Sequence, residues 1–281
     1  MPKKILNILI YIFAIIGFVL VGGFFAVKFG LTNTRGVIDN QRESFINGGK
    51  NTASVVNSQN QNYYWTTLPE WQTIKAAVIK DQAVINRASL TAGVSPRLIV
   101  TQLVVEQLRL FYTERESYKK FFEPLKILGS QTQFSWGVMG MKEETAILVE
   151  KNLKDKTSPF YLGTEFEHLL DLSASTADSP LRREQERFTR MTDQHDHYYS
   201  YLYAGLYLKQ IQTQWKNAGY NISNSPDILA TLYNIGFKGS KPNPDPKSGG
   251  AEIVIGEYKY SFGSLGGEFY NSNELLSEFP R

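Results

Sequence analysis

A carboxylate interrupts one of the most apolar stretches of the chain. Residues Leu98–Phe111 read LIVTQLVVEQLRLF, with Glu106 in the middle. An ionised carboxylate in apolar surroundings is costly unless it is paired, solvated in a cleft or kept protonated. Arg109, three residues on, can pair with it as a partly exposed group on the rim of a helix. Alternatively, Glu106 faces a cleft and acts as a general acid. The residue types leave both interpretations open.

The segment that carries Glu106 is predicted to be a helix. Ser95 suits the N-cap position and Pro96 the first helical position, and apolar residues follow without a break. Similar patterns, several with a glycine at the end, predict further helices over residues 69–93, 141–153, 196–219 and 225–236. The polar residues 173–187 are predicted to be a connection between helices, and their charges a solvated surface.

Near the C-terminal end the pattern changes from helical to alternating. Residues 251–263 read AEIVIGEYKYSFG, with apolar and polar residues alternating on both sides of Gly256–Glu257. A two-residue Gly-X turn between alternating segments is typical of a β-hairpin. The fold class predicted for the globular part is therefore mainly α, with a small β-hairpin.

The N-terminal residues predict a membrane anchor. Ile5–Val27 carries no charged residue and is long enough to cross a hydrocarbon core of about 30 Å. Lys3 and Lys4 precede it, which favours a cytoplasmic N-terminus and places the rest of the chain outside. A cleaved signal peptide is the alternative. We expect an anchor over residues 1–29, a polar stalk over 30–61 and a folded domain over 62–281.

Composition limits the other classes of function. The net charge of the 281 residues is only +3, so no strong basic field indicates nucleic-acid binding. Cysteine is absent and histidine occurs three times, and the i, i+2 spacing of His195 and His197 does not suit one helical face. We therefore expect neither a metal site nor a cofactor, and interpret the segment around these histidines as a solvated helix N-terminus.

Four motifs in order make the chain resemble the superfamily of lytic transglycosylases and goose-type lysozymes, which cut bacterial peptidoglycan. They are GVSPRLIVTQLVVEQ, GVMGMKEETA, YAGLYLKQI and LATLYNIG, and they span about Gly93 to Gly236. The resemblance implies a lysozyme-like helical domain with Glu106 at the catalytic position. It implies a substrate-binding groove formed by Ser135, Gly137, Val138, Met139, Tyr233 and Asn234. Of these, Tyr233 would steady the catalytic carboxyl and Asn234 would cap its turn.

The chain also departs from the family pattern. Gln107 stands where a serine usually follows the glutamate, Gly140 replaces the family glutamine, and Glu143 replaces a proline. An insert, residues 114–134, lengthens the distance between Glu106 and the segment GVMGM, residues 137–141, which we call the Gly-Met loop. The loss of the glutamine side chain removes an expected sugar contact but leaves the proton chemistry intact.

The resemblance implies a membrane-anchored lytic transglycosylase that cleaves the bond between N-acetylmuramic acid and N-acetylglucosamine and leaves a 1,6-anhydro end. No Asp or Glu lies between Gly129 and Met141, so a mechanism with one carboxylate is favoured over one with two. The implied partners are peptidoglycan strands, the cell membrane and an envelope-spanning assembly. A hydrolytic muramidase and a non-catalytic, glycan-binding scaffold are the alternatives.

Overall fold

The computed structural model describes residues 17–18, 21–22, 63–112, 135–173, 179–193 and 195–281. The predicted polar stalk, the insert 114–134 and most of the predicted anchor lie outside these residues. In the described part of the chain, no helix combines the length and the apolar character needed to cross a membrane. The described residues are mainly helical, as predicted, with two small antiparallel β-hairpins.

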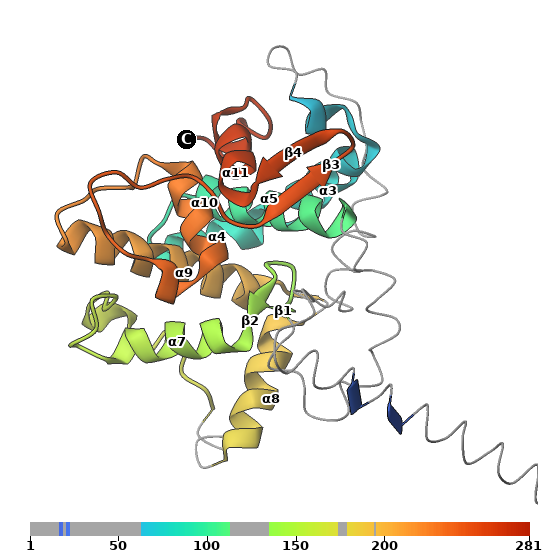
Figure 1. The fold of residues 1–281 in the computed structure, drawn as a ribbon. Coiled ribbons are helices and arrows are strands. Elements are labelled where there is room, and N and C mark those ends of the chain that lie inside the picture. Colours follow the sequence, from blue (N-terminus) through green and yellow to red (C-terminus); the bar gives the residue numbers. More distant parts are fainter. Residues whose placement is uncertain (1–16, 19–20, 23–62, 113–134, 174–178, 194) are drawn as a thin grey trace, which may run out of the picture.

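Helices make up most of the described residues (Figure 1). In order, the α-helices are α3 Pro69–Lys80, α4 Gln82–Ala92, α5 Pro96–Tyr112, α7 Glu143–Lys154, α8 Pro180–Met191, α9 Tyr198–Asn217, α10 Pro226–Ile235 and α11 Phe262–Asn271. Short 3-10 turns are η1 Tyr64–Thr67, η4 Thr164–Phe166 and η6 Phe237–Gly239. The strands are β1 Ser135–Trp136, β2 Met141–Lys142, β3 Glu252–Ile255 and β4 Tyr258–Ser261, paired β1 with β2 and β3 with β4.

The helix that carries Glu106 is the centre of the core. α5 packs against α3, α4, α9, α10 and α11 and against β3. Every residue from Arg97 to Leu110 is buried, so no face of this helix meets bulk solvent along fourteen residues. A helix buried on all sides must satisfy its polar side chains internally. Arg97, Gln107 and the pair of Glu106 with Arg109 meet this requirement, whereas the side-chain amide of Gln102 has no hydrogen-bond partner among the described residues.

The first predicted helix is in fact two. Residues 69–93 form α3 and α4, which are separated at Asp81. The Asp81 carboxylate lies against His197 and accepts a hydrogen bond of 2.7 Å from the Tyr201 hydroxyl. His197 is only 4% exposed, so the prediction of a solvated N-terminus at this histidine is wrong. Asp81 is the physical reason, because it gives a buried imidazole a hydrogen-bonding partner.

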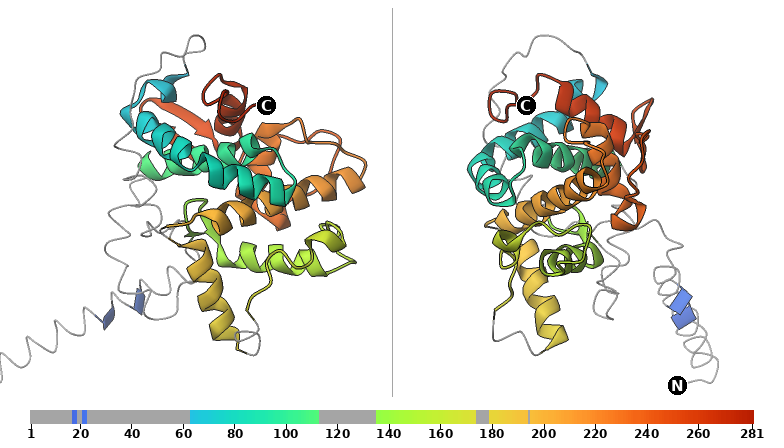
Figure 2. Two further views of the ribbon diagram at one scale, coloured as in Figure 1. Left: turned by 180° about the vertical axis from the view of Figure 1, so that it is seen from behind. Right: turned by 90° about the vertical axis from the view of Figure 1, so that its left-hand side faces the viewer.

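The prediction of a polar connection over residues 173–187 is also wrong, because much of it is helical. Ser179 caps α8 by accepting from the backbone N–H of Arg182, and Pro180 occupies the first turn. Figure 2 shows the N-terminal end of α8 extending away from the other helices. Within the charged run, Arg187 is buried rather than solvated and forms ion pairs with Glu143 and Glu150 of α7. These ion pairs hold α8 to the rest of the domain.

The C-terminal hairpin is confirmed, and a helix follows it. β3 and β4 pair from Glu252 with Ser261 to Ile255 with Tyr258, so the turn falls at the predicted Gly256–Glu257. α11 was not predicted, because its sequence FGSLGGEFYN contains three glycines, which disfavour helices. A Cβ at Gly266 would lie 2.6 Å from the Cβ of Ala230, so glycine permits the close packing of α11 on α10.

Arg97 connects the start of α5 to the C-terminal segment. Its side chain is fully buried, and its guanidinium donates hydrogen bonds of 2.9–3.1 Å to five backbone carbonyls, those of Phe269, Tyr270, Ser272, Glu274 and Phe279. Two of these carbonyls belong to the last turn of α11, where a helix has no partners of its own for them, and three follow the helix. One side chain therefore binds five carbonyls that lie in and after the last turn of α11.

We predict that Arg97→Lys lowers the free energy of unfolding by about 3 kcal/mol or more, because lysine cannot reach all five carbonyls and leaves some buried without a donor. Chemical unfolding of the chain in mild detergent measures this loss. Arg87→Lys is the matched control, because Arg87 pairs with Asp196 at an exposed site, 56% and 51% accessible. The control should cost less than about 1 kcal/mol. Equal losses in the two variants would contradict the role of Arg97.

Candidate functional site

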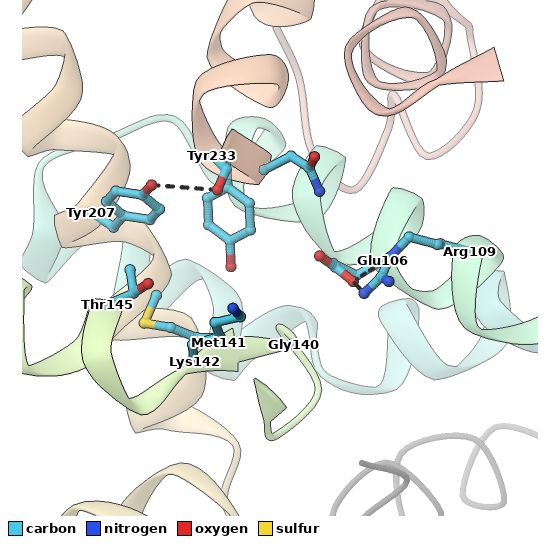
Figure 3. A pocket seen from close by; sticks show the side chains of 9 residues that line it. Glu106, Arg109, Gly140, Met141, Lys142, Thr145, Tyr207 and Tyr233 are labelled. Atoms are coloured by element: carbon cyan, nitrogen blue, oxygen red, sulfur yellow. Dashed lines mark hydrogen bonds and ion pairs between the residues drawn. The ribbon is translucent and has the colours of Figure 1, made fainter. Parts of the chain in front are cut away.

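Glu106 lies on α5 in a buried ion pair. Arg109 donates to its Oε2 atom from Nε at 3.0 Å and contacts the same oxygen through Nη2. The two side chains are only 5% and 4% exposed. The pairing with Arg109 is thus present, but the pair does not lie on an exposed helix rim. Figure 3 shows one carboxylate oxygen beside Arg109 and the other on the side of Tyr233.

The Gly-Met loop closes over this carboxylate. β1 and β2 pair at Ser135 with Lys142 and Trp136 with Met141, so the four residues between them form a tight turn. Gly140 has φ of +59°, and a Cβ built on it would lie 2.9 Å from Oε2 of Glu106. Glycine is therefore required here both by the backbone conformation and by the approach of the carboxylate. This position, where the family pattern has glutamine, has no room for a side chain.

Two buried side chains hold the loop by its backbone. Gln107 donates from Nε2 to the carbonyl of Val138 at 2.7 Å, and the Tyr233 hydroxyl donates to the carbonyl of Met139 at 3.0 Å. The side chains of Val138 and Met139 are fully buried in the core. Gln107, which replaces the family serine, thus has a function in this structure, because it fixes the loop from the residue next to Glu106.

Tyr233 reaches the site from α10. Its hydroxyl hydrogen-bonds the loop rather than the Glu106 carboxylate. Burial, and then the nearby charge of Glu106, raises the pKa of Tyr233 well above its usual range, so the hydroxyl keeps its proton and remains a donor. Tyr207 of α9 packs against it with ring centroids 5.2 Å apart and donates to the Leu232 carbonyl at 3.3 Å. These contacts hold the Tyr233 side chain in place on the side of the site opposite Arg109.

The residue after Tyr233 has a supporting contact. The Oδ1 atom of Asn234 accepts a hydrogen bond of 2.8 Å from the backbone N–H of Ala251. This bond links the end of α10 to the segment that enters β3. Asn234 therefore positions Tyr233 by anchoring the helix that carries it.

These residues enclose a small cavity of about 50 Å³ (Figure 3). Nine residues line it: Glu106, Arg109, Gly140, Met141, Lys142, Thr145, Tyr207, Tyr233 and Asn234. Among these nine lining residues of the described chain, Glu106 is the one carboxylate. A cavity of this volume has room for a few water molecules, not for a sugar ring. In this conformation the space beside the carboxylate is too small for a sugar ring.

The structure brings together only part of the predicted set. Glu106, Tyr233 and Asn234 line the cavity, whereas Gly137, Val138 and Met139 are not among its described lining residues, and the side chain of Ser135 lies outside the described part of the structure. The sequence interpretation did not assign Lys142, Thr145 or Tyr207 to the site. Tyr207 belongs to the YAGLYLKQI motif, and Lys142 and Thr145 to GVMGMKEETA, so the motifs themselves were the signal that could have found them.

Compared with protein-family models, curated proteins and solved structures, the chain matches none of them. The functional interpretation therefore depends on the motifs and on the geometry of the described residues.

We predict that Gly140→Ala destabilises the domain more than the same change at Gly219. Both glycines have positive φ, +59° and +90°, but a Cβ at Gly219 meets no atom within 4 Å. Gly219→Ala should cost about 1 kcal/mol of unfolding free energy from backbone strain. Gly140→Ala should cost at least about 1 kcal/mol more, because its Cβ also displaces the buried Glu106. Chemical unfolding compares them, and equal losses would show that the carboxylate does not require this glycine.

Proposed function

We propose that the chain is a membrane-anchored lytic transglycosylase with a lysozyme-like domain. The supporting observation is the convergence on one cavity of Glu106, the glycine of the Gly-Met loop and Tyr233. These groups come from three motifs that are far apart in the sequence and that the resemblance associates with one site. A carboxylate on a buried helix, facing a glycine-lined loop, is an arrangement suited to acid–base chemistry on a bound glycan.

In the proposed reaction Glu106 is both acid and base. It gives a proton to the oxygen that links muramic acid to the next sugar, and the bond between that oxygen and C1 breaks. The substrate's N-acetyl group assists this departure. Glu106 then takes the proton of the C6 hydroxyl as its oxygen bonds to C1, which closes the 1,6-anhydro ring. The carboxyl recovers its proton, and no water is consumed.

The ion pair between Glu106 and Arg109 has to open before this reaction can begin. A substrate has to reach the Glu106 carboxyl, and the cavity beside it has room for a few water molecules only. Both hydrogen bonds from Arg109 end on Oε2. Substrate binding therefore has to separate Arg109 from Glu106 and to widen the cavity, and part of the binding energy is used for this change.

The residues that line the Glu106 cavity favour a mechanism with one carboxylate over the usual hydrolytic mechanism with two. Glycosidases with two carboxylates place a second one within about 10 Å of the first, as nucleophile or as base for water. Among the described residues that line the cavity, no second carboxylate accompanies Glu106. An anhydro product is accordingly favoured over a hydrolysed reducing end.

A non-catalytic, glycan-binding scaffold is the second candidate. The observation in its favour is the small cavity, in which Arg109 pairs with the only lining carboxylate of the described residues. For either candidate, residues 5–27 would tether the domain to the outer face of the cell membrane, where it meets the nearest wall. Such a location suits local remodelling for an envelope-spanning assembly.

We predict that the 281-residue chain clears a peptidoglycan gel and that Glu106→Gln reduces this activity at least about 100-fold, because the amide cannot exchange the proton. The released muropeptides should carry 1,6-anhydro ends, which mass spectrometry identifies. Glu144→Gln is the matched control, because Glu144 is exposed in the first turn of α7 and should leave clearing unchanged.

Reducing ends in place of anhydro ends would replace the transglycosylase assignment with a muramidase. Glycan binding without clearing, unchanged in Glu106→Gln, would favour the scaffold instead.

A further inference from the structure

Gln102 carries a buried side-chain amide without a hydrogen-bonding partner. Neither its Nε2 nor its Oε1 atom has one among the described residues, and its exposed fraction is 0%. Burying an unpaired amide is costly, and most buried polar side chains in proteins have a partner. An apolar side chain of similar shape would cost less, so stability alone does not account for glutamine at this position.

The unpaired amide is an exception on α5. Six polar side chains lie between Arg97 and Leu110 on this buried helix. The other five form hydrogen bonds or an ion pair, and they are Arg97, Thr101, Glu106, Gln107 and Arg109. The one unpaired group of this helix therefore calls for an explanation other than the packing of the core.

Gln102 precedes Glu106 by one turn on the same face of the helix. Both lie in the uninterrupted helix Pro96–Tyr112, and a spacing of four residues brings Cβ atoms to within about 6 Å. Glutamine can hydrogen-bond an acidic side chain at this spacing. Helix geometry thus places the Gln102 amide within reach of the Glu106 carboxyl.

Arg109 holds that carboxyl in the small cavity. It contacts Oε2 of Glu106 through Nε and Nη2, from a position three residues further along the helix. While Arg109 holds the carboxylate, Gln102 makes no bond to it. Two donors therefore flank one carboxylate along α5, and only Arg109 is paired with it.

We propose that Gln102 is a positioning residue that binds the Glu106 carboxyl when a substrate separates Arg109 from it. The Gln102 Nε2 then donates to the carboxylate, so Glu106 is not left buried without a donor. This bond offsets part of the cost of opening the ion pair. The inference rests on the proposed function, because entry of the substrate is the event that opens the pair.

The first test is chemical unfolding of the 281-residue chain in mild detergent. Gln102→Met keeps the length of the side chain and removes the amide, so the urea midpoint should stay the same or rise. Ser200→Ala is the matched control, because the hydroxyl of Ser200 on α9 is also buried without a partner among the described residues. A midpoint lowered by about 0.5 M or more in Gln102→Met would overturn the proposal, because it would indicate a bond in the absence of substrate.

The same change should have the opposite sign in a chain that lacks the Arg109 guanidinium. In Arg109→Met, Gln102 is the donor that remains within reach of Glu106. Adding Gln102→Met should then lower the urea midpoint by about 0.5 M or more, because a buried carboxylate loses its hydrogen bond. Ser200→Ala should show no such reversal. An equal effect of Gln102→Met in both backgrounds would overturn the proposal.

Cleavage of a soluble chain of alternating N-acetylglucosamine and N-acetylmuramic acid gives a readout that does not need the Arg109 variant. Gln102→Met should raise the KM about tenfold and leave kcat within about twofold, because the lost bond forms on binding and persists through the reaction. Ser200→Ala should leave both constants unchanged. An unchanged KM in Gln102→Met would overturn the proposal.

The outcomes for the two proposals are separable. A chain that cuts glycan with an unchanged KM in Gln102→Met refutes the role of Gln102 alone. A wild-type chain that does not cut glycan refutes the proposed enzymatic activity. In that case the unfolding comparison in the two backgrounds decides whether Gln102 is the second partner of Glu106, because it does not depend on catalysis.

Discussion

Burial of α5 on every face is the constraint from which the rest of the structure follows. A helix without a solvent face cannot leave polar side chains to water, so its polar groups gain from partners within the protein. Arg97 binds carbonyls in and after the last turn of α11, Gln107 holds the Gly-Met loop, and Glu106 pairs with Arg109. The side-chain amide of Gln102, on the same helix, has no hydrogen-bond partner among the described residues. The polar residues of this helix thus determine which distant segments pack against it. The core and the candidate site are products of the same requirement.

The position of the Gly-Met loop depends on its contacts with the buried helix α5 and with α10. Its two buried side chains, Val138 and Met139, anchor it in the core, while their carbonyls accept from Gln107 and Tyr233. These contacts hold the loop against Glu106, and Gly140 is the residue that fits the remaining space. Glycine at the position where the pattern of the resembled superfamily has glutamine is therefore consistent with the rest of the site.

Much of the fold could be predicted, because local signals suffice for helices that begin with Ser-Pro and end with Gly. α5 and α10 begin at the predicted prolines, and α4 ends before the predicted Gly93. The rest depends on long-range contacts. α11 is helical despite its glycines because it packs closely on α10, and α8 is held by ion pairs with α7. In the site, the sequence shows that Arg109 lies three residues after Glu106, so the pairing of the two could be predicted. Lys142 lines the same cavity only because the β1–β2 turn brings it there.

The two buried carboxylates on either side of the start of α7 differ in one physical respect. Glu106 is charge-balanced within its own helix, since Arg109 supplies both donors to one oxygen. Separating that pair without a replacement would leave a buried charge and cost several kcal/mol, about 3–5 by analogy with broken buried pairs. The site is therefore stable when empty, and a substrate that opens it has to supply interactions of similar strength. Glu143, by contrast, has no donor on its second oxygen, so its carboxyl group is only half satisfied by Arg187.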